Sequence, residues 1–385
     1  MIKQKILVVG DFTTRIRSQQ FIQKILQKDL GQKFHFTISI CNPNTYKANN
    51  KLPALVRYFI DKLLSILFFI ELLIKIPLND KILFLAMNHR YFPALLLANT
   101  IWRRPIIADM YISIYDALKS RDQFNGAFLK RLATFRFEWY YKYLDRLIIE
   151  RPSQTIYNGD LEFKLISNLV NADINKSNYV IIPTSALTKL KINPSPSEVF
   201  RICWWGTFMP FHGVDTIIKA ARFLKESGVS FTLNLFGTPK NDTKPYEILV
   251  NDLQLSNYVF FHTDKTFTNC LLEKYLHTNC DLAFGNFSDS ERAFRIFPTK
   301  IIDSFSMNIP VLTMATEVIG DGADINNDLF TCTNEPLDIC AEVIKIINNP
   351  NEKERRANNG FALYETFYSE DMVQKTFISL FGISN

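Results

Sequence analysis

The sequence lacks most of the short motifs that mark nucleotide, metal or covalent-catalysis sites. It has no GxGxxG or Walker loop, no nucleophile elbow and no CxxC pair. Its five histidines are scattered, so none has the spacing of a metal-ligand cluster. These absences argue against P-loop, dinucleotide-binding and zinc proteins, and they leave the loops that follow strands as the places to look for a site.

The sequence predicts neither a disulfide framework nor a leader. Its six cysteines have mostly apolar neighbours, which is typical of reduced core residues in a cytoplasmic protein. Residues 1–10 predict a strand rather than a signal peptide. We therefore expect the protein to be cytoplasmic.

Long hydrophobic runs are absent as well. The strongest, residues 63–74, has 12 residues and contains Glu71, whereas a spanning helix needs about 20 apolar residues. The run predicts a buried helix. The alternative is a helix that lies on a membrane, with Arg57, Lys62 and Lys75 at headgroup level.

Charge is divided unevenly along the chain. Residues 1–190 carry 27 Lys/Arg and 14 Asp/Glu, whereas residues 191–385 carry 17 and 24. The basic half is expected to meet something anionic, such as a membrane surface or a lipid-linked phosphate, unless its charge is only a solvated surface. Nucleic acid is not an expected partner, because no binding motif is present and the basic residues are dispersed.

Short buried strands alternate with helical patterns over the whole length. This alternation predicts an α/β fold with two Rossmann-like domains that face one another across a cleft. The stiff connector Asn193-Pro194-Ser195-Pro196 marks the boundary, so we expect domains over 1–190 and 191–370. The predicted strands are 5–9, 34–40, 81–86, 105–108, 146–149, 179–182, 200–205, 229–236, 258–261, 281–284 and 309–314.

A helix start at Pro298 is the most informative local feature. Proline suits the first turn, and the backbone N–H groups that follow form an anion site at the positive helix end. Lys300 adds a cation there, and Asp303 lies about one turn further on. This start could hold a diphosphate with its amides and lysine, and a sugar hydroxyl pair with its carboxylate.

Other loops after strands in the second half are weaker candidates. Gly206-Thr207 opens a glycine-containing loop that ends at His212-Gly213 and could cradle a phosphate, although His212 could equally be a surface or capping residue. Gly237 follows the next strand. The turn from His262 and Thr263 to Lys265 could hydrogen-bond a base or could be a plain polar turn.

In the first half, polar residues follow two strands. Gly10 and Asp11 come after the first strand, and Asp109 with Tyr111 comes after the strand at 105–108. Asp109 is a candidate acid or base at the carboxyl end of a strand. The alternative is a helix N-cap aspartate.

The second half resembles the donor-binding domain of GT-B glycosyltransferases, in particular family 4-like retaining enzymes. The similarity covers residues 200–370 and follows the order Gly206-Thr207-Phe208, His212-Gly213, Gly237, Pro298 to Asp303 and Asn308-Ile309-Pro310-Val311. The first half is similar in its general βα layout and in Asp109-Met110-Tyr111-Ile112-Ser113. Bacterial relatives of this type often build surface polysaccharides or lipid-linked oligosaccharides.

The resemblance implies a retaining hexosyl transfer from a nucleotide sugar to a glycan or lipid-linked acceptor, in polysaccharide, lipopolysaccharide or glycoconjugate biosynthesis. It implies no metal or other cofactor, a protein peripheral on the inner face of the cytoplasmic membrane, and a tail, residues 371–385, whose helix crosses back to the first domain. The implied catalytic residues are Asp109, Lys300 and His212. The donor side would use Gly206, Thr207, Gly237, His262, Thr263, Arg295, Thr299, Lys300 and Asp303, and the acceptor side Gly10, Asp11, Asp109 and Tyr111.

Two departures from the family pattern keep other functions open. Arg295 stands where the family commonly has the first of two glutamates separated by seven intervening residues, the second position being Asp303. The usual Arg and Lys of the first phosphate loop are absent, so His212 would have to supply that cation. The alternatives are a non-catalytic nucleotide-sugar or glycan-binding protein on a GT-B frame, and a GT-B nucleotide-sugar epimerase.

Overall fold

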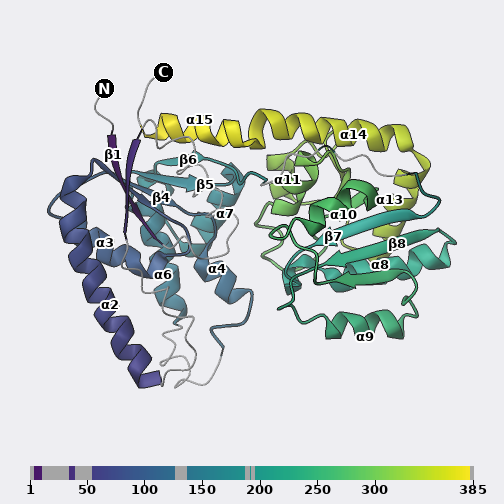
Figure 1. The fold of residues 1–385 in the computed structure, drawn as a ribbon, viewed down its shortest axis with the longest axis horizontal. Helices are drawn as coiled ribbons and strands as arrows, with labels where there is room; N and C mark the ends of the chain where they lie inside the picture. Colours follow the sequence, from purple (N-terminus) through teal and green to yellow (C-terminus); the bar gives the residue numbers. More distant parts are fainter. Residues whose placement is uncertain are drawn as a thin grey trace. The chain divides into compact units, whose positions relative to one another are not determined.

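The chain forms two compact units in a computed structural model that describes residues 4–10, 34–39, 54–125, 137–186, 191 and 196–381, without the side chains of 54–62. Unit 1 comprises Met1–Ile182 with Phe377–Asn385, and unit 2 comprises Pro183–Thr376. Each unit is an α/β layer structure around a parallel sheet (Figure 1). Asp11 and residues 193–195 of the expected connector lie outside the described residues.

Unit 1 is built on a six-stranded parallel sheet in the order β2-β1-β3-β4-β5-β6. Its inner strands are apolar on both faces because helices cover both faces of a parallel sheet. The strands are β1 Gln4–Val9, β2 Phe34–Ile38, β3 Lys81–Phe84, β4 Ile106–Asp109, β5 Gln154–Tyr157 and β6 Tyr179–Ile181. The helices are α2 Ala54–Lys75, α3 Phe92–Asn99, α4 Ile114–Lys119, α6 Glu138–Glu150 and α7 Asp160–Val170, with short turns η3 Ile76–Leu78, η4 His89–Tyr91 and η5 Ile174–Lys176.

The strand predicted over 146–149 is wrong, because these residues end helix α6. Leu147, Ile148 and Ile149 suggest a strand when taken alone, but Tyr141, Leu144 and Ile148 recur at helical spacing and are buried. The strand of this βα unit is β5, which begins after the bend at residues 151–153.

Unit 2 repeats the plan with the strand order β12-β11-β10-β7-β8-β9. Its strands are β7 Phe200–Trp205, β8 Phe231–Phe236, β9 Val259–His262, β10 Leu282–Phe284, β11 Val311–Met314 and β12 Phe330–Cys332. Its helices are α8 Val214–Glu226, α9 Lys244–Asp252, α10 Leu271–Asn279, α11 Thr299–Ser306, α12 Glu317–Gly322, α13 Pro336–Asn348 and α14 Pro350–Leu363, with turns η6 Pro210–His212 and η7 Tyr364–Tyr368. The predicted fold class, two Rossmann-like α/β units, is confirmed.

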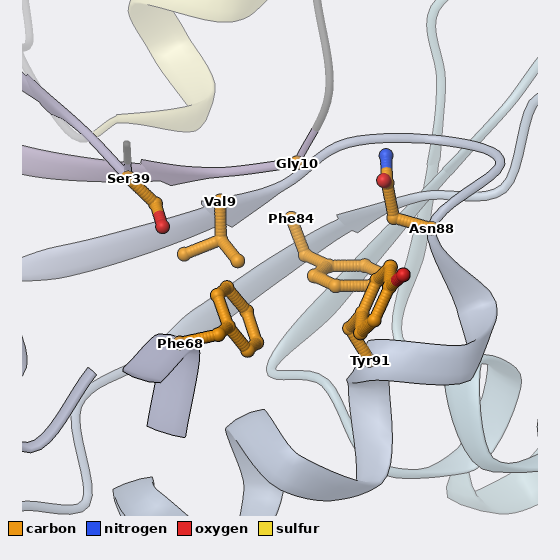
Figure 2. A pocket seen from close by; sticks show the side chains of 7 residues that line it. All are labelled: Val9, Gly10, Ser39, Phe68, Phe84, Asn88 and Tyr91. Carbon is orange, nitrogen blue, oxygen red and sulfur yellow. The ribbon is translucent and has the colours of Figure 1, made fainter. Parts of the chain in front are cut away.

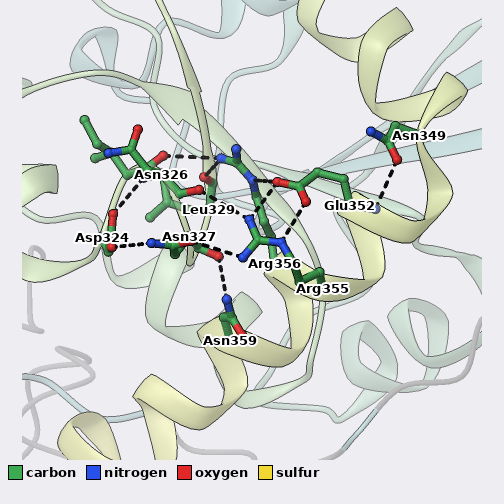
Figure 3. A network of polar contacts seen from close by, with 10 residues as sticks. Asp324, Asn326, Asn327, Leu329, Asn349, Glu352, Arg355, Arg356 and Asn359 are labelled. Atoms are coloured by element: carbon green, nitrogen blue, oxygen red, sulfur yellow. Dashed lines mark hydrogen bonds and ion pairs between the residues drawn. The ribbon is translucent and has the colours of Figure 1, made fainter.

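Helix α14 is fixed to the turn before β12 by a polar network. Glu352 accepts hydrogen bonds from both Arg355 and Arg356, and these arginines reach backbone carbonyls at Asn326 and Leu329 (Figure 3). The network is close to the surface and satisfies the carbonyls of an irregular turn, so we assign it a structural role.

The chain end belongs to unit 1. The division between the units falls at Phe377, inside the last helix, α15 Glu370–Leu380. Phe381 is fully buried, with its ring centroid 5.2 Å from that of Phe34 and 6.3 Å from that of Phe36. The Nζ of Lys81 donates to the carbonyl of Phe381 at 3.0 Å.

Candidate functional site

The start of helix α11 lies at the centre of the candidate site in unit 2. Pro298 is extended, with φ −69° and ψ 127°, and is the residue before the helix rather than its first turn. No side chain caps this end, and Thr299 is half-buried at the first helical position. The first backbone N–H groups therefore have no side-chain acceptor, which is the arrangement that suits an anion.

Lys300 is held inside the protein rather than in solvent. Its Nζ donates to Asn286 Oδ1 at 2.5 Å and lies 5.0 Å from the ring centroid of Trp204. Burial lowers the pKa of Lys300 to about 7, although the nearby Asp303 carboxylate partly offsets this. Asp303 is also buried and accepts a hydrogen bond from Trp205 Nε1 at 3.2 Å.

His212 is a buried, uncharged neighbour of Lys300. Its Nδ1 has no hydrogen-bond partner among the described residues. Burial, followed by the positive charges of Lys300 and Arg292, holds the pKa of His212 well below its usual value. His212 is therefore neither a surface nor a capping residue, and its depressed pKa argues against its serving as the cation of the phosphate loop.

Arg292, a residue with no motif to mark it in the sequence, places a cation near that loop. Its guanidinium lies 5.0 Å from the ring centroid of Phe211, whose ring is 4.4 Å from that of His212. Its side chain is 3% exposed, so the charge is buried. By contrast, Arg295 Nη1 donates to the exposed Glu291 carboxylate at 3.3 Å.

Glycine is required where the loop after β7 packs most tightly. A Cβ on Gly206 would lie 2.8 Å from the Trp204 ring and 3.3 Å from His212 Cε1. Gly213 has φ 69°, and a Cβ there would lie 2.2 Å from the Phe287 carbonyl oxygen. These close approaches hold the loop against the residues that follow β10.

The remaining loops at this edge of the sheet are connected to one another. A Cβ on Gly237 would lie 2.6 Å from the Phe208 ring. The carbonyl of Thr207 accepts a hydrogen bond from Asn241 Nδ2 at 2.8 Å, so the loops after β7 and β8 are joined. Thr207 itself is exposed.

His262 ends strand β9 and is held on three sides. Its ring stacks on Phe236 with centroids 4.7 Å apart, and Nε2 is 3.1 Å from Asn234 Oδ1. Nδ1 lies 3.3 Å from Lys265 Nζ, and burial with this charge lowers the pKa of His262. Thr263, the next residue, is half-buried.

Asp109 is the buried carboxylate at the end of β4 in unit 1. Its Oδ2 has no hydrogen-bond partner among the described residues. Burial raises the pKa of Asp109 to about 7, against the opposing effect of backbone hydrogen bonds at Tyr111 and Ala86. Asp109 is not an N-cap, because Ser113 caps α4 by accepting from the N–H of Asp116.

A second buried group, not foreseen from the sequence, fixes the segment after Asp109. Asp145 accepts hydrogen bonds from Ser113 Oγ at 2.6 Å and the Tyr115 N–H at 3.0 Å. His89 Nε2 lies 3.5 Å from Asp145 Oδ1 and 3.3 Å from Met110 Sδ. Burial raises the pKa of Asp145 to about 7 and lowers that of His89 to about 3.

A small pocket opens beside Gly10 at the carboxyl ends of the first strands. Gly10 has φ 142°, and a Cβ there would lie 2.7 Å from Leu85 Cβ and 2.8 Å from Asn88 Nδ2. Figure 2 shows apolar rings on one side of the pocket and the polar groups of Ser39 and Asn88 at its rim. The lining residues are Val9, Gly10, Ser39, Phe68, Phe84, Asn88 and Tyr91.

Two searches of the described residues give negative findings. In that part of the chain, no three His, Cys, Asp or Glu side chains converge to hold a metal ion. No helix among the described residues is both long and apolar enough to cross a membrane.

Comparison with known proteins identifies the fold. No family model and no curated protein matches the sequence. Among solved structures, HepE of Anabaena in complex with UDP-glucose is 14% identical over 98% of both chains, with a TM-score of 0.67. Sucrose-phosphate synthase of Thermosynechococcus elongatus is 11% identical over 98% of both chains (TM-score 0.69). The glycosyltransferase WaaG is 13% identical over 99% of this chain and 100% of its own (TM-score 0.62).

At these identities the comparisons show the fold alone, and that fold is the GT-B fold of glycosyltransferases. The resemblance drawn from the sequence is therefore confirmed at the level of fold. Unit 2 brings together Gly206, His212, Lys300 and Asp303. Asp109 and Gly10 lie in unit 1.

Proposed function

We propose that the protein is a retaining glycosyltransferase that moves a hexose from a nucleotide-sugar donor to a glycan or lipid-linked acceptor. One observation carries the proposal. Two buried cations, Lys300 and Arg292, flank an uncharged His212 beside a helix start with no side-chain cap. A positive helix end with a lysine and an arginine close by suits an anion, and HepE, which has this fold, is in complex with UDP-glucose.

In the proposed reaction, the bond between the sugar C1 and the diphosphate oxygen breaks, and C1 bonds to the acceptor oxygen on the same face. The acceptor proton passes to the departing phosphate. Lys300, Arg292 and the α11 N–H groups stabilise the charge that develops on the leaving group. A metal is not required for this stabilisation.

The finer assignments are part of the same proposal. Asp303 would hold the nucleotide ribose, the His262–Thr263 turn would border the base, and Asp109 would face the acceptor. WaaG is involved in lipopolysaccharide biosynthesis, which favours a bacterial surface glycan as the product class. We further propose that the protein works in the cytoplasm, as a peripheral protein at the membrane surface.

A thermal-shift screen against UDP, GDP, CMP, dTDP, ADP and their common sugar conjugates tests the donor site. A ligand that binds only the folded state raises the melting temperature. We expect one nucleoside diphosphate and its sugar conjugate to do so, and Lys300→Met to reduce the shift. If none of these ligands shifts the wild type, the donor site is wrong.

Arg295 favours a second candidate, a nucleotide-sugar-binding protein without transfer activity. It stands at a position where the resemblance leads us to expect an acidic residue, and it is engaged with Glu291. Measuring the release of nucleoside diphosphate from the bound sugar conjugate, in the presence of a broad panel of acceptors, distinguishes a transferase from a binding protein. Binding without release would support this candidate, and donor conversion without any acceptor would indicate an epimerase.

A further inference from the structure

Asp109 is held by backbone N–H groups from two separate segments of unit 1. The N–H of Ala86 comes from the turn after β3, and the N–H of Tyr111 comes from the segment after β4. In the part of the chain that the structure describes, Asp109 Oδ2 accepts no hydrogen bond. The direction in which this oxygen points therefore depends on where the two segments lie.

Both segments are fixed by one buried carboxylate, that of Asp145 on α6, a helix that packs against both α4 and η4. After β4, Ser113 Oγ donates to Asp145 Oδ2 at 2.6 Å, and the Tyr115 N–H donates to the same oxygen at 3.0 Å. After β3, His89 Nε2 lies 3.5 Å from Asp145 Oδ1. The same nitrogen is 3.3 Å from Met110 Sδ, so His89 also joins the two segments directly.

Short stretches of chain connect these contacts to the N–H groups that hold Asp109. Asn88 Nδ2 donates to the Ala86 carbonyl at 2.8 Å, so Ala86 and His89 belong to one hydrogen-bonded turn. On the other side, only two residues separate the N–H of Tyr111 from Ser113 along the chain. A shift of the Asp145 carboxylate would therefore reach Asp109 from both sides.

A simpler role for Asp145 would be to cap α4. Its carboxylate accepts hydrogen bonds from the N–H groups of Ile114 and Tyr115, which are the first residues of that helix. A cap alone does not account for the contact with His89, because His89 lies in η4 and not in α4. The contact on the second segment is what indicates a role beyond capping.

We propose that Asp145 is a positioning residue, which clamps the two segments that orient the Asp109 carboxylate toward the acceptor. This inference rests on the proposed function, in which Asp109 faces the acceptor. Asp145 is fully buried, so it does not touch the acceptor itself. Its effect on turnover should therefore pass through Asp109.

A double-mutant cycle on turnover tests the proposal. Asp145→Ala alone should lower kcat by about tenfold, because a displaced Asp109 carboxylate orients the acceptor poorly. The same substitution in the Asp109→Asn background should change kcat by less than about twofold. The dissociation constant of the nucleoside diphosphate should stay the same in both backgrounds, because the proposed donor site lies in unit 2.

Asp145→Asn is the conservative variant and should restore turnover. Its amide oxygen can still accept from Ser113 and Tyr115. Its NH₂ group can donate to His89 Nε2, because the proton of the ring can move to Nδ1, which has no partner among the residues described. We therefore expect kcat within about threefold of the wild-type value.

Two further variants separate positioning from general destabilisation. Asn99→Ala is the matched control, because Asn99 makes two hydrogen bonds with the backbone of Arg104 at the turn after α3 in unit 1. It should lower the melting temperature without lowering kcat. Ser113→Ala releases one of the contacts to Asp145 and keeps the carboxylate, so it serves if Asp145→Ala does not fold. It should lower kcat by about threefold, and only while Asp109 is present.

Hydrogen exchange gives a readout that needs no activity. The amides of Ala86 and Tyr111 should exchange faster in Asp145→Ala than in the wild type or in Asn99→Ala. Unchanged exchange would overturn the proposal. So would an equal loss of kcat with and without Asp109, which is the result expected of a cap alone. A wild type without any transfer activity would overturn the proposed function instead, and exchange would then decide alone whether Asp145 holds Asp109 in place.

Discussion

At the scale of single residues, the proposed donor site has a row of three aromatic rings with a cationic side chain at each end. Lys300 lies over Trp204, whose ring is 5.5 Å from that of His212, and Phe211 follows with Arg292 beyond it. The faces of aromatic rings attract cations, which reduces the cost of keeping these charges inside. Under the proposed function, these two cations would meet the donor diphosphate.

Replacing Lys300 by methionine should remove the pH dependence of nucleoside diphosphate binding. With a pKa of about 7, Lys300 is charged below pH 7. Above pH 7 it must take up a proton before it can pair with the diphosphate. Wild-type affinity should therefore fall by up to about tenfold per pH unit above 7, which is about 1.4 kcal/mol. Calorimetric titrations from pH 6 to pH 9 measure the slope.

The same substitution should change stability in a defined direction. The unfolded chain keeps the Lys300 proton to about pH 10.5, so wild-type stability rises with pH between about 7 and 10.5. Lys300→Met should lack this rise and melt at a higher temperature than the wild type at pH 7. Lys219→Met, at an exposed position on α8, is the control. A wild-type affinity independent of pH would remove Lys300 from the diphosphate site.

Arg292 and Arg295 should behave differently although they lie one helical turn apart in sequence. Arg292→Gln removes a buried cation of the row and should weaken nucleoside diphosphate binding by about 10- to 100-fold. Arg295→Gln breaks a partly exposed pair with Glu291 and should change affinity less than about threefold. The dissociation constants of nucleoside diphosphate for the two variants test this prediction. Equal losses of affinity would contradict the role given to Arg292.

Asp109→Asn should lower turnover and flatten the acid side of the stability profile. Burial raises the pKa of Asp109 from 3.8 to about 7. Its contribution to the free energy of unfolding is therefore fully present below about pH 4 and is lost as the pH rises through 7. At pH 8 the variant should be more stable than the wild type by roughly 1–3 kcal/mol. Its turnover should fall by about 10²-fold if Asp109 orients the acceptor hydroxyl.

The control for Asp109 is Asp122→Asn, at an exposed position with φ 51° that asparagine tolerates well. Turnover and melting curves from pH 4 to pH 9 are compared for both variants. Unchanged turnover in Asp109→Asn would leave Asp109 as a buried structural carboxylate.

The sequence was informative for residues that lie within one motif. Lys300 and Asp303 are three residues apart at a helix start, so their proximity follows from helix geometry. Arg292 and Asn286 reach the same place from a loop whose path depends on tertiary packing. Asp145 gave no signal, because a carboxylate within a helix usually faces water, and only the fold brings Ser113 to it.

At the scale of elements, Gly213 sets how helix α8 begins. It has φ 69°, and a Cβ would clash with the Phe287 carbonyl. Gly213→Ala should therefore destabilise unit 2 by about 3 kcal/mol or more, from backbone strain and the clash together. Gly228→Ala is a matched control, since Gly228 has φ 72° but nothing within 4 Å, and it should cost only about 1 kcal/mol.

Melting temperatures of the two glycine variants measure the difference. The nucleotide-induced thermal shift should also shrink in Gly213→Ala, because the loop before α8 carries His212. If both variants lose the same stability, the close approach to Phe287 is not what requires glycine at position 213.

Elements were predicted well where apolar runs are short and bounded. Strand β7 matches its predicted bounds, Phe200–Trp205, because Gly206 ends it and its last four residues are buried. The prediction failed for α6, where an apolar helix end has the composition of a strand. Strand β12, Phe330–Cys332, was not predicted.

At the scale of the whole molecule, the last residues of the chain complete unit 1. Phe381 is fully buried against Phe34 and Phe36, which lie on strand β2 at the sheet edge. The family resemblance implied a helix in the tail, and the helix there, α15, carries the chain to this position. Which side chains it would meet could not be read from the sequence, because the contact joins residues more than 300 positions apart.

Phe381→Ala should therefore destabilise unit 1 selectively. Removing a fully buried phenylalanine costs about 3–5 kcal/mol, because a cavity is left beside β2. A protein with two units need not unfold in one step. Hydrogen exchange is therefore followed separately in unit 1, at β1 and β3, and in unit 2, at β7 and β8. Protection should fall in β1 and β3 alone. Phe367→Ala, at a 44% exposed position, is the control and should leave both sheets protected. If Phe381→Ala lowered the protection of both sheets equally, the tail would not stabilise unit 1 in particular.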